Sequence, residues 1–371
     1  MNTKFDVIII GSGVIGMSIA RELSQKGLRI AIIDRNVRGM YASYAAGGML
    51  GAHNEFTESC SLFHLARQSQ AMFQSLKDRL LSEVGLDIEY LESGLVKMAK
   101  NEIDNPIVEQ QFQFLHQHDS NTQLLSSKSL EAITDNNVQS QTLTAMLIPK
   151  DHQVNANQYT KALLLSLAKR HIQLIDHSEV QAITKQNNGY TVMTQKDTYR
   201  AEKVVVAAGA WSGQLLNQYF SQNPVTGVKG EVLLVEHPTL NLQTTLFMTN
   251  GCYIVPKKNH RYLIGATSYV DDYSIGVTKP GKHWLCKQAQ HYVPNLANSK
   301  LIHQWSGIRP TSTNGQPIMD EVDHHLFVVT GHHRNGILLS PLIGLKMSEW
   351  IESGRRPTEF EDFSIERSCK T

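Results

Sequence analysis

The chain has 371 residues, more than one hydrophobic core usually serves, so two domains are expected. Its 35 lysines and arginines nearly balance its 34 acidic residues, so charge does not favour nucleic acid or an anionic membrane as a partner. No apolar run reaches membrane-spanning length, and the first strand is expected within a few residues of Met1, which leaves no room for a signal peptide. The four cysteines, Cys60, Cys252, Cys286 and Cys369, form no CxxC pair. These features predict a cytoplasmic protein without a zinc site.

The N-terminal segment has the pattern of a dinucleotide-binding βαβ unit. The β-branched run 7–10 predicts a strand buried on both faces, and GSGVIG follows at 11–16. Gly11 allows the tight turn, Gly13 lets a pyrophosphate approach the backbone, and Gly16 lets the following helix pack close to the strand. The next strand ends at Asp34, where a carboxylate accepts hydrogen bonds from ribose hydroxyls. NAD and FAD share this opening, so the pattern alone leaves the dinucleotide undecided.

Small residues dominate the stretch 39–52. One interpretation is a tightly packed turn or helix start. The other is that Gly47 and Gly48 let a flat ring lie against bare backbone, with Met49 covering one side.

The middle of the chain alternates between helical and strand patterns. Helical periodicity predicts a continuous helix over 61–84, and a polar helical stretch without readable chemistry covers 101–141. A buried strand at 204–206 ends on the small residues of AAGAWS, which suits a chain that returns to the dinucleotide. The remaining expected elements are a strand at 95–98, a helix at 158–170, a strand at 172–175 and a hairpin of 180–184 with 190–194.

Between 225 and 309 the pattern predicts strands without long helices. The runs 228–235, 251–256 and 261–267 are expected to be neighbours in an antiparallel sheet. Tyr253 and Arg309 are the candidate pocket residues, because an arginine binds a carboxylate through two parallel hydrogen bonds and a tyrosine hydroxyl completes such a site. For a lone arginine the alternative is a surface ion pair.

The C-terminal part repeats the strand-to-helix theme. A strand at 326–330 is followed by GHHRNG at 331–336 and a helix through Trp350. The start of this helix is placed to stabilise negative charge that develops on a reduced ring. The adjacent histidines lack a third ligand at sensible spacing, so no metal site is predicted.

Several blocks occur together and in one order along the chain: GSGVIG with Asp34, AAGGMLGA at 45–52, VVVAAGAWS at 204–212, VKGE at 228–231, CYIVP at 252–256, GAT at 265–267, SGIRP at 306–310 and GHHRNGILLSP at 331–341. In these blocks the chain resembles the FAD-dependent amino-acid oxidases of the D-amino-acid oxidase superfamily, above all the glycine oxidases of thiamine biosynthesis. The resemblance implies an α/β fold, with a Rossmann-like, glutathione-reductase-like FAD-binding domain and an α+β substrate domain on a mostly antiparallel sheet. We expect the FAD-binding domain at 1–86, 151–216 and 318–371, and the substrate domain at 87–150 and 217–317.

The resemblance also implies roles for individual residues. Tyr253 and Arg309 match the pair that binds the substrate carboxylate, and Arg334 borders the substrate. No cysteine matches a covalent flavin link, so FAD is expected to be non-covalent. The expected cofactor residues are Gly11, Gly13, Gly16 and Asp34 for the ADP half, Ser43, Ala46, Gly47, Gly48, Met49 and Leu50 for the ribityl chain and flavin ring, Val180 on the adenine side, and Arg334, Asn335, Gly336, Ile337 and Leu338 for the pyrimidine end. Val14, Ile15, Arg35 and Gly209 are further expected cofactor residues.

The implied activity is the oxidative deamination of glycine and other small amines, with oxygen as acceptor and a homotetramer as the assembly. Gly251 and Ser268 depart from the glycine oxidase pattern, which has a histidine and a bulkier apolar residue there, and so put strict glycine preference in question. Two alternatives stay open: a flavin-dependent D-amino-acid dehydrogenase that passes electrons to a quinone or a protein, and a non-catalytic dinucleotide-binding module. An NAD-dependent dehydrogenase is disfavoured, because the motif at 331–341 would have no task in it.

Overall fold

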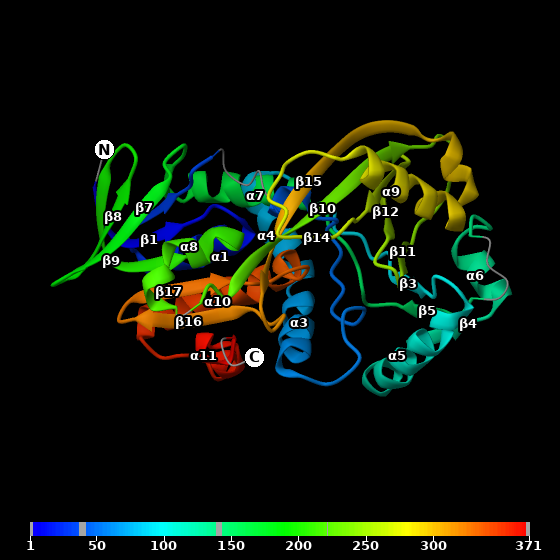
Figure 1. The fold of residues 1–371 in the computed structure, drawn as a ribbon, viewed down its shortest axis with the longest axis horizontal. Coiled ribbons are helices and arrows are strands. Elements are labelled where there is room, and N and C mark those ends of the chain that lie inside the picture. The colour runs from blue at the N-terminus through cyan, green and yellow to red at the C-terminus, as the bar shows by residue number, and fades with distance from the viewer. Residues whose placement is uncertain (1–2, 37–41, 139–142, 221, 369–371) are drawn as a thin grey trace.

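The computed structural model describes residues 3–36, 42–138, 143–220 and 222–368. Two sheets lie side by side, and the long strands β10 (Val225–Glu236) and β15 (Lys300–Ser312) run from their boundary across the second sheet (Figure 1). The part of the small-residue stretch before residue 42 falls outside the described residues. The two-sheet arrangement confirms the predicted α/β class.

The first sheet has eight strands in the order β16-β17-β9-β1-β2-β6, with the hairpin β7–β8 attached to β9. Strands β17, β9, β1, β2 and β6 are parallel, as the buried β-branched runs predict. The strand order reverses at β1, with β2 and β6 on one side of it and β9 and β17 on the other. A ligand site is therefore expected beyond the carboxyl end of β1. The bounds are β1 Lys4–Ile10, β2 Ile30–Ile33, β6 Gln173–Ile175, β7 Val180–Gln186, β8 Gly189–Thr194, β9 Thr198–Val206, β16 Ile318–Asp323 and β17 Leu326–Thr330.

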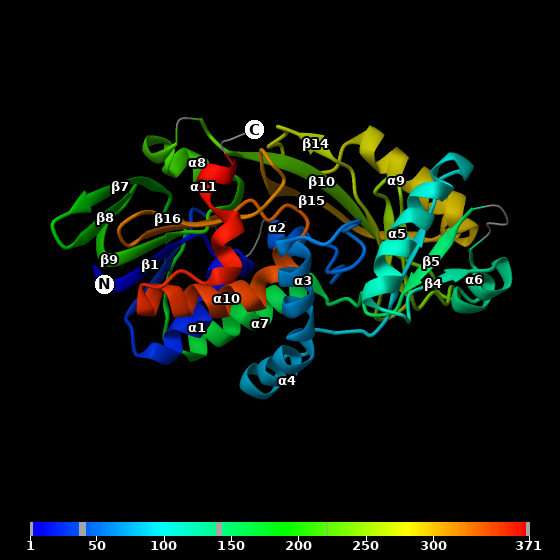
Figure 2. The same ribbon diagram turned by 90° about the horizontal axis from the view of Figure 1, so that it is seen from below.

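Helices α1 (Val14–Leu23), α7 (Ala156–Lys169) and α10 (Gly336–Ser353) pack side by side against this sheet (Figure 2). The predicted helix over 61–84 is wrong in one respect: it divides at Met72 into α3 (Ser61–Ala71) and α4 (Phe73–Val84), and the Met72 N–H donates to Ser69 O at 3.1 Å instead of one residue further back. The short helices of this half are η1 Ser24–Lys26, α2 Ala42–Ala45, η3 Gly209–Trp211, α8 Ser212–Leu215, η4 Asn217–Tyr219, η6 Thr358–Phe363 and α11 Ile365–Ser368.

The second sheet has nine strands in the order β14-β10-β13-β12-β11-β3-β5-β4, with β15 also paired to β10. All its pairs are antiparallel except β11 with β3. The predicted neighbours are confirmed, because Gly265 of β13 pairs with both Val232 and Tyr253. The other bounds are β3 Leu95–Met98, β4 Gln123–Leu125, β5 Ala145–Ile148, β11 Thr245–Met248, β12 Tyr253–Lys257, β13 Arg261–Gly265 and β14 Tyr269–Val270.

The prediction that residues 225–309 contain no long helix is wrong, because α9 (Lys279–Tyr292) lies there. Its start carries ordinary helix signals: the Thr278 side chain accepts from Gly281 N, and Pro280 stands in the first turn. The other helices of this half are α5 Asn105–His118, α6 Ser127–Ile133, η2 Glu102–Asp104 and η5 Pro294–Asn298.

The strands of the first sheet come from segments 1–86, 151–216 and 318–371, and those of the second from 87–150 and 217–317. Where each domain begins and ends stays a prediction. Among the described helices, none combines the length and the apolar character that a membrane span requires.

Candidate active site

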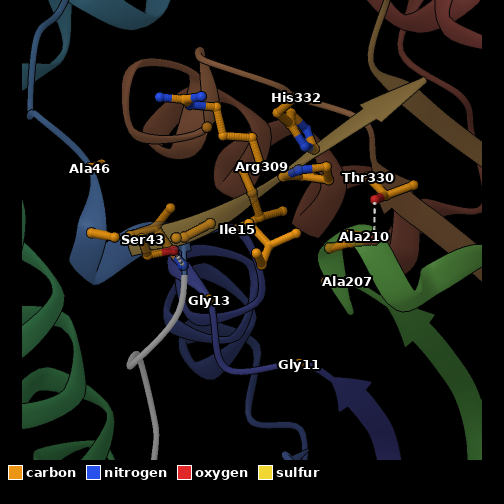
Figure 3. A pocket seen from close by; sticks show the side chains of 18 of the residues that line it. Gly11, Gly13, Ile15, Ser43, Ala46, Ala207, Ala210, Arg309, Thr330 and His332 are labelled. Atoms are coloured by element: carbon orange, nitrogen blue, oxygen red, sulfur yellow. Dashed lines mark hydrogen bonds between the residues drawn. The ribbon is translucent and has the colours of Figure 1, made fainter. Parts of the chain in front are cut away.

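A cavity of about 580 Å³ lies between the two sheets. This volume is within the range of small-molecule and cofactor sites. In Figure 3, Arg309 and His332 lie on one side of the cavity, and the turn that contains Gly11 and Gly13 lies on the other. The predicted site residues that line the cavity are Gly11, Gly13, Val14, Ile15, Asp34, Arg35, Ser43, Ala46, Gly47, Gly48, Met49, Val180, Gly209, Tyr253, Arg309, Arg334, Asn335, Gly336 and Ile337.

Three predicted cofactor residues do not line the cavity: Gly16, Leu50 and Leu338. Gly16 instead lets α1 approach β1, since a Cβ there would lie less than 3.0 Å from Gly11 O. Leu50 and Leu338 are buried in the core behind the wall. The side chains of Leu50 and Leu338 therefore do not face a cofactor bound in the cavity.

The turn after β1 is shaped by backbone packing. Gly11 has φ +109°, and a Cβ there would lie less than 3.0 Å from Ala207 O at the end of β9. No side chain caps α1 at Gly13, although the Val14 N–H donates to Ser43 Oγ at 3.0 Å. The helix therefore presents backbone N–H groups and its positive dipole end to the cavity, which suits a pyrophosphate.

Asp34 stands at the end of β2, where the motif predicts it. Its Oδ2 accepts from Ser12 N at 2.7 Å and from Ser12 Oγ at 2.8 Å, and its Oδ1 accepts from Asn36 N at 3.0 Å. These bonds orient the carboxylate at the cavity edge, where it can also accept from a ribose hydroxyl because a carboxylate has about four acceptor positions. Beside it, the Arg35 guanidinium lies 3.8 Å from the centre of the Trp211 ring, which closes this end of the cavity.

A second helix begins at the other end of the cavity. Helix α10 starts after Asn335 without a side-chain cap, and Gly336 and Ile337 of its first turn line the cavity. Two uncapped helix N-termini therefore face one cavity, which makes both ends favourable for negative charge.

The small-residue segment forms the wall between these helix starts. Gly48 has φ +80°, its carbonyl accepts from Val154 N at 2.8 Å, and a Cβ there would lie less than 3.0 Å from Val154 O. A Cβ on Gly47 would lie 3.2 Å from the ring of Tyr253. Bare backbone at these two positions leaves room for a flat ring between the wall and the second sheet.

Arg309 and Tyr253 come together although 56 positions separate them. Arg309 lies on β15 opposite Val228 of β10, and its guanidinium crosses Gly230, where a Cβ would lie less than 3.0 Å from the guanidinium nitrogens. Its Nη1 donates to Thr267 O at 3.2 Å, and within the described part of the chain it forms no salt bridge. Burial lowers the pKa of Arg309, while the nearby Tyr253 opposes that shift. A half-buried guanidinium that faces a cavity without a carboxylate partner is unlike a surface ion pair and suits an anionic ligand.

Tyr253 is 5% exposed and is held by its neighbours on three sides. Its ring lies against the backbone of Gly265 and Gly47, and it stacks on Phe247 with centroids 6.3 Å apart and an interplanar angle of 20°. Burial raises the pKa of the Tyr253 hydroxyl, so this group stays protonated and able to donate a hydrogen bond.

Arg334 lies beside the ring of Phe247, on which Tyr253 stacks. Its Nη2 is 3.2 Å from Glu55 Oε1, and its guanidinium lies 4.9 Å from the centre of the Phe247 ring. Lys97 approaches the same ring at 5.7 Å and donates to Asn54 O at 3.2 Å. Burial lowers the pKa of Lys97 to about 8.

The two adjacent histidines are neutral groups, His332 buried and His333 half-buried. Burial lowers the pKa of His332 to about 3 and that of His333 to about 4. Among the described residues, no group of three or more His, Cys, Asp or Glu side chains is arranged to hold a metal ion. Nε2 of His332, a residue that lines the cavity, is buried without a hydrogen-bond partner in the described chain. An orphaned buried polar atom beside a cavity fits a site that a polar ligand completes.

Gly251 and Ser268, which depart from the glycine oxidase pattern, are not among the residues that line the cavity. Gly251 has φ +83° in the turn between β11 and β12, with open space around its Cβ position, and Ser268 is exposed beside β14. The structure thus removes the reason to infer a reshaped pocket from these two positions.

The geometry agrees with what comparison with known proteins shows. A family model described as FAD dependent oxidoreductase matches residues 6–350. The chain belongs to this family. Glycine oxidase of Geobacillus kaustophilus (strain HTA426) is 37% identical over 369 residues, which are 99% of this chain and 98% of that protein.

Solved structures of this family show the same fold. The crystal structure of glycine oxidase from Geobacillus kaustophilus has a TM-score of 0.95 and covers 98% of this chain and 99% of that chain. Glycine oxidase from Bacillus cereus ATCC 14579 has a TM-score of 0.88 at 33% identity, covering 95% of this chain and 96% of that chain. The predicted resemblance is confirmed, and the chain is an FAD-dependent, glycine oxidase-like oxidoreductase.

Sequence reasoning missed Glu55, Phe247, Lys97 and Trp211, which surround the predicted residues. Lys97 left one signal, a charged residue inside the otherwise apolar run 95–98. Phe247 left none, because its contact with Arg334 depends on the pairing of β11 with β12 and on the turn before α10.

Proposed function

We propose that this protein oxidises glycine and other small amines, including sarcosine, D-alanine and D-proline, to the imine. Hydrolysis of the imine formed from glycine or D-alanine releases ammonia and the 2-oxo acid, and oxygen is reduced to hydrogen peroxide. The observation that carries the proposal is the half-buried Arg309 guanidinium, which lies across Gly230 next to the protonated Tyr253 hydroxyl and has no carboxylate partner within the described part of the chain. Arg309 and Tyr253 together can bind both oxygens of an amino-acid carboxylate.

The residues of the chain orient the substrate. Arg309 neutralises the carboxylate and Tyr253 donates a hydrogen bond to it, so the Cα–H bond is directed towards the wall formed by Gly47 and Gly48. No side-chain base is required when the amine is neutral, because the hydrogen leaves Cα with its electron pair. FAD held in the cavity would supply the hydride acceptor and the route by which the electrons reach oxygen.

The cofactor residues named above would hold FAD without a covalent bond. The start of α1 would bind the pyrophosphate, Asp34 the ribose, and the start of α10 the pyrimidine end of the ring. The small residues along the wall and the unpartnered Nε2 of His332 support this assignment.

Further properties are proposed from family resemblance. The imine from glycine would supply the thiazole of thiamine, and the enzyme would be a cytoplasmic homotetramer with domain boundaries as given above. Three free cysteines among the described residues, Cys60, Cys252 and Cys286, are compatible with a reducing compartment.

The test is the visible spectrum of the purified protein under anaerobic conditions. Glycine, sarcosine, D-alanine and D-proline are added in turn, and air is then admitted. Bleaching of the flavin band by glycine and its return in air, with hydrogen peroxide formed, is the expected result. A band that bleaches but returns only with a quinone would identify the dehydrogenase alternative, and a colourless protein that binds no added FAD would overturn the proposal.

A further inference from the structure

Lys257 has a hydrogen-bond environment that the proposed mechanism does not use. It ends strand β12, four residues after Tyr253, and its ammonium group donates to three neutral acceptors. These are Gly47 O at 2.9 Å, Val154 O at 3.0 Å and Gln153 Oε1 at 2.8 Å. All three N–H donors of the ammonium are thus satisfied without a carboxylate.

The positive charge of Lys257 is not cancelled by an ion pair. Within the described part of the chain, no carboxylate lies within salt-bridge distance of it, and Glu89 acts on it only at longer range. The charged groups around it have other partners: Glu89 accepts from Asn155 at 3.0 Å, Arg261 pairs with Glu236 at 3.1 Å, Lys258 pairs with Asp87 at 2.9 Å, and Asp151 accepts from His53, Asn54 and Gln70.

This charge lies directly behind the cavity wall. The Gly47 carbonyl that Lys257 binds belongs to the wall, and the same glycine packs against the ring of Tyr253. Through its hydrogen bonds, Lys257 connects the second sheet with the cavity wall and with the segment before α7. Its ammonium group thus binds the carbonyl of a residue that lines the space in which the cofactor is proposed to bind.

We propose that Lys257 is a positioning residue that holds the Gly47–Gly48 peptide at the wall and places a positive charge behind it, which favours the reduced state of FAD bound in the cavity. This inference rests on the proposed function. Hydride transfer breaks the Cα–H bond of the substrate and carries one proton and two electrons to the flavin, so the flavin gains one negative charge while the product leaves as the iminium. A positive charge without an ion-pair partner, close to the flavin and partly shielded from water, stabilises the anionic reduced flavin more than the neutral oxidised flavin.

The position of Lys257 also implies a pH dependence. Burial lowers the pKa of Lys257 to about 7. Negative charge in the cavity raises that pKa, so between the two values reduction is accompanied by the uptake of a proton from solvent at Lys257. In this window the reduction equilibrium changes an additional tenfold per pH unit, which for a two-electron couple is about 30 mV. Below the window Lys257 is charged in both states, and above it the residue is neutral in both.

The experiment is a spectroelectrochemical titration of the FAD-loaded protein from pH 5.5 to 9. The proteins compared are the wild type, Lys257→Met, Lys257→Arg and the control Lys258→Met, which removes the exposed lysine next in the chain. At pH 6 we expect Lys257→Met to disfavour reduction by tenfold or more, a shift of at least about 30 mV to more negative potential, and to lose the extra pH dependence. Lys257→Arg is expected to keep the wild-type potential at pH 6, and Lys258→Met at every pH.

An unchanged potential in Lys257→Met with FAD bound would overturn the inference. If that variant does not fold, the wild-type titration decides the matter, because a potential without the additional slope above about pH 7 also overturns it. Failure of the wild type to bind FAD would instead overturn the proposed function, so the two outcomes are distinguishable.

Discussion

The glycines on the two sides of the cavity have different neighbours. On the cofactor side, a Cβ at Gly11 or Gly48 would meet a backbone carbonyl, and both residues have positive φ. On the substrate side, a Cβ at Gly230 or Gly265 would meet the side chain of Arg309 or of Tyr253. The cofactor half is therefore shaped by close backbone packing that cannot yield without moving strands. In the substrate half, glycines make room for reactive side chains, which can shift while the fold persists.

The largest effect is expected from Gly11→Ala. The new methyl group would strain a backbone at φ +109° and clash with Ala207 O, at a cost of roughly 2–5 kcal/mol in stability. We expect loss of bound FAD and a lower unfolding temperature, measured by the ratio of flavin to protein absorbance and by a thermal melt. The control is Gly27→Ala, where φ is +70° but the space is open, with an expected cost of about 1–2 kcal/mol. A Gly11→Ala protein with full FAD content and an unchanged melt would contradict this account of the cofactor half.

Arg309→Ala is expected to act on the substrate and not on the cofactor. Loss of a charged hydrogen-bonding partner of about 1.5–3 kcal/mol corresponds to a roughly 10- to 100-fold higher KM for glycine. FAD content and thermal stability should stay close to wild type. Arg261→Ala, which removes an exposed partner of Glu236, is the matched control and should leave KM unchanged. Unchanged kinetics in Arg309→Ala would remove this residue from the site.

Gly230→Ala tests whether the substrate half tolerates an added methyl group, which the cofactor half is expected not to tolerate at Gly11. Its methyl group would push the Arg309 guanidinium aside without meeting backbone, so we expect KM for glycine to rise by roughly 3- to 10-fold, or about 0.6–1.4 kcal/mol, at nearly constant stability. Steady-state kinetics and a thermal melt of the same preparation measure both quantities. If the variant loses FAD or unfolds as Gly11→Ala does, the contrast between the two halves is wrong.

The smallest effect is expected from Ser268→Met. Because Ser268 is exposed and does not line the cavity, KM for glycine should change by less than about twofold, within the ordinary range of surface substitutions. The ratio of kcat/KM for glycine to that for D-proline is the sensitive measurement. A clear change in this ratio would place residue 268 in the substrate site after all.

The sequence predicted the cofactor half more completely than the substrate half. Gly11, Gly13 and Asp34 could be assigned because a turn, a helix start and a strand end within one short segment carry the whole motif. The contact between Phe247 and Arg334 could not be predicted, since it depends on strand pairing and on a turn far along the chain. Helix α9 was missed although Thr278 and Pro280 are ordinary start signals, because the surrounding strand pattern outweighed them.

By itself the sequence determined the βαβ unit, the kind of fold and the two residues proposed to bind a carboxylate, because local spacing and residue type carry that information. Only the tertiary structure decided that Arg309 lines the cavity without a carboxylate partner among the described residues, that Gly251 and Ser268 lie outside the cavity, and that the charge of Lys257 stands behind its wall. The physical reason is that burial, strand register and electrostatic partners arise from segments far apart in the chain, and no local pattern encodes which of them meet.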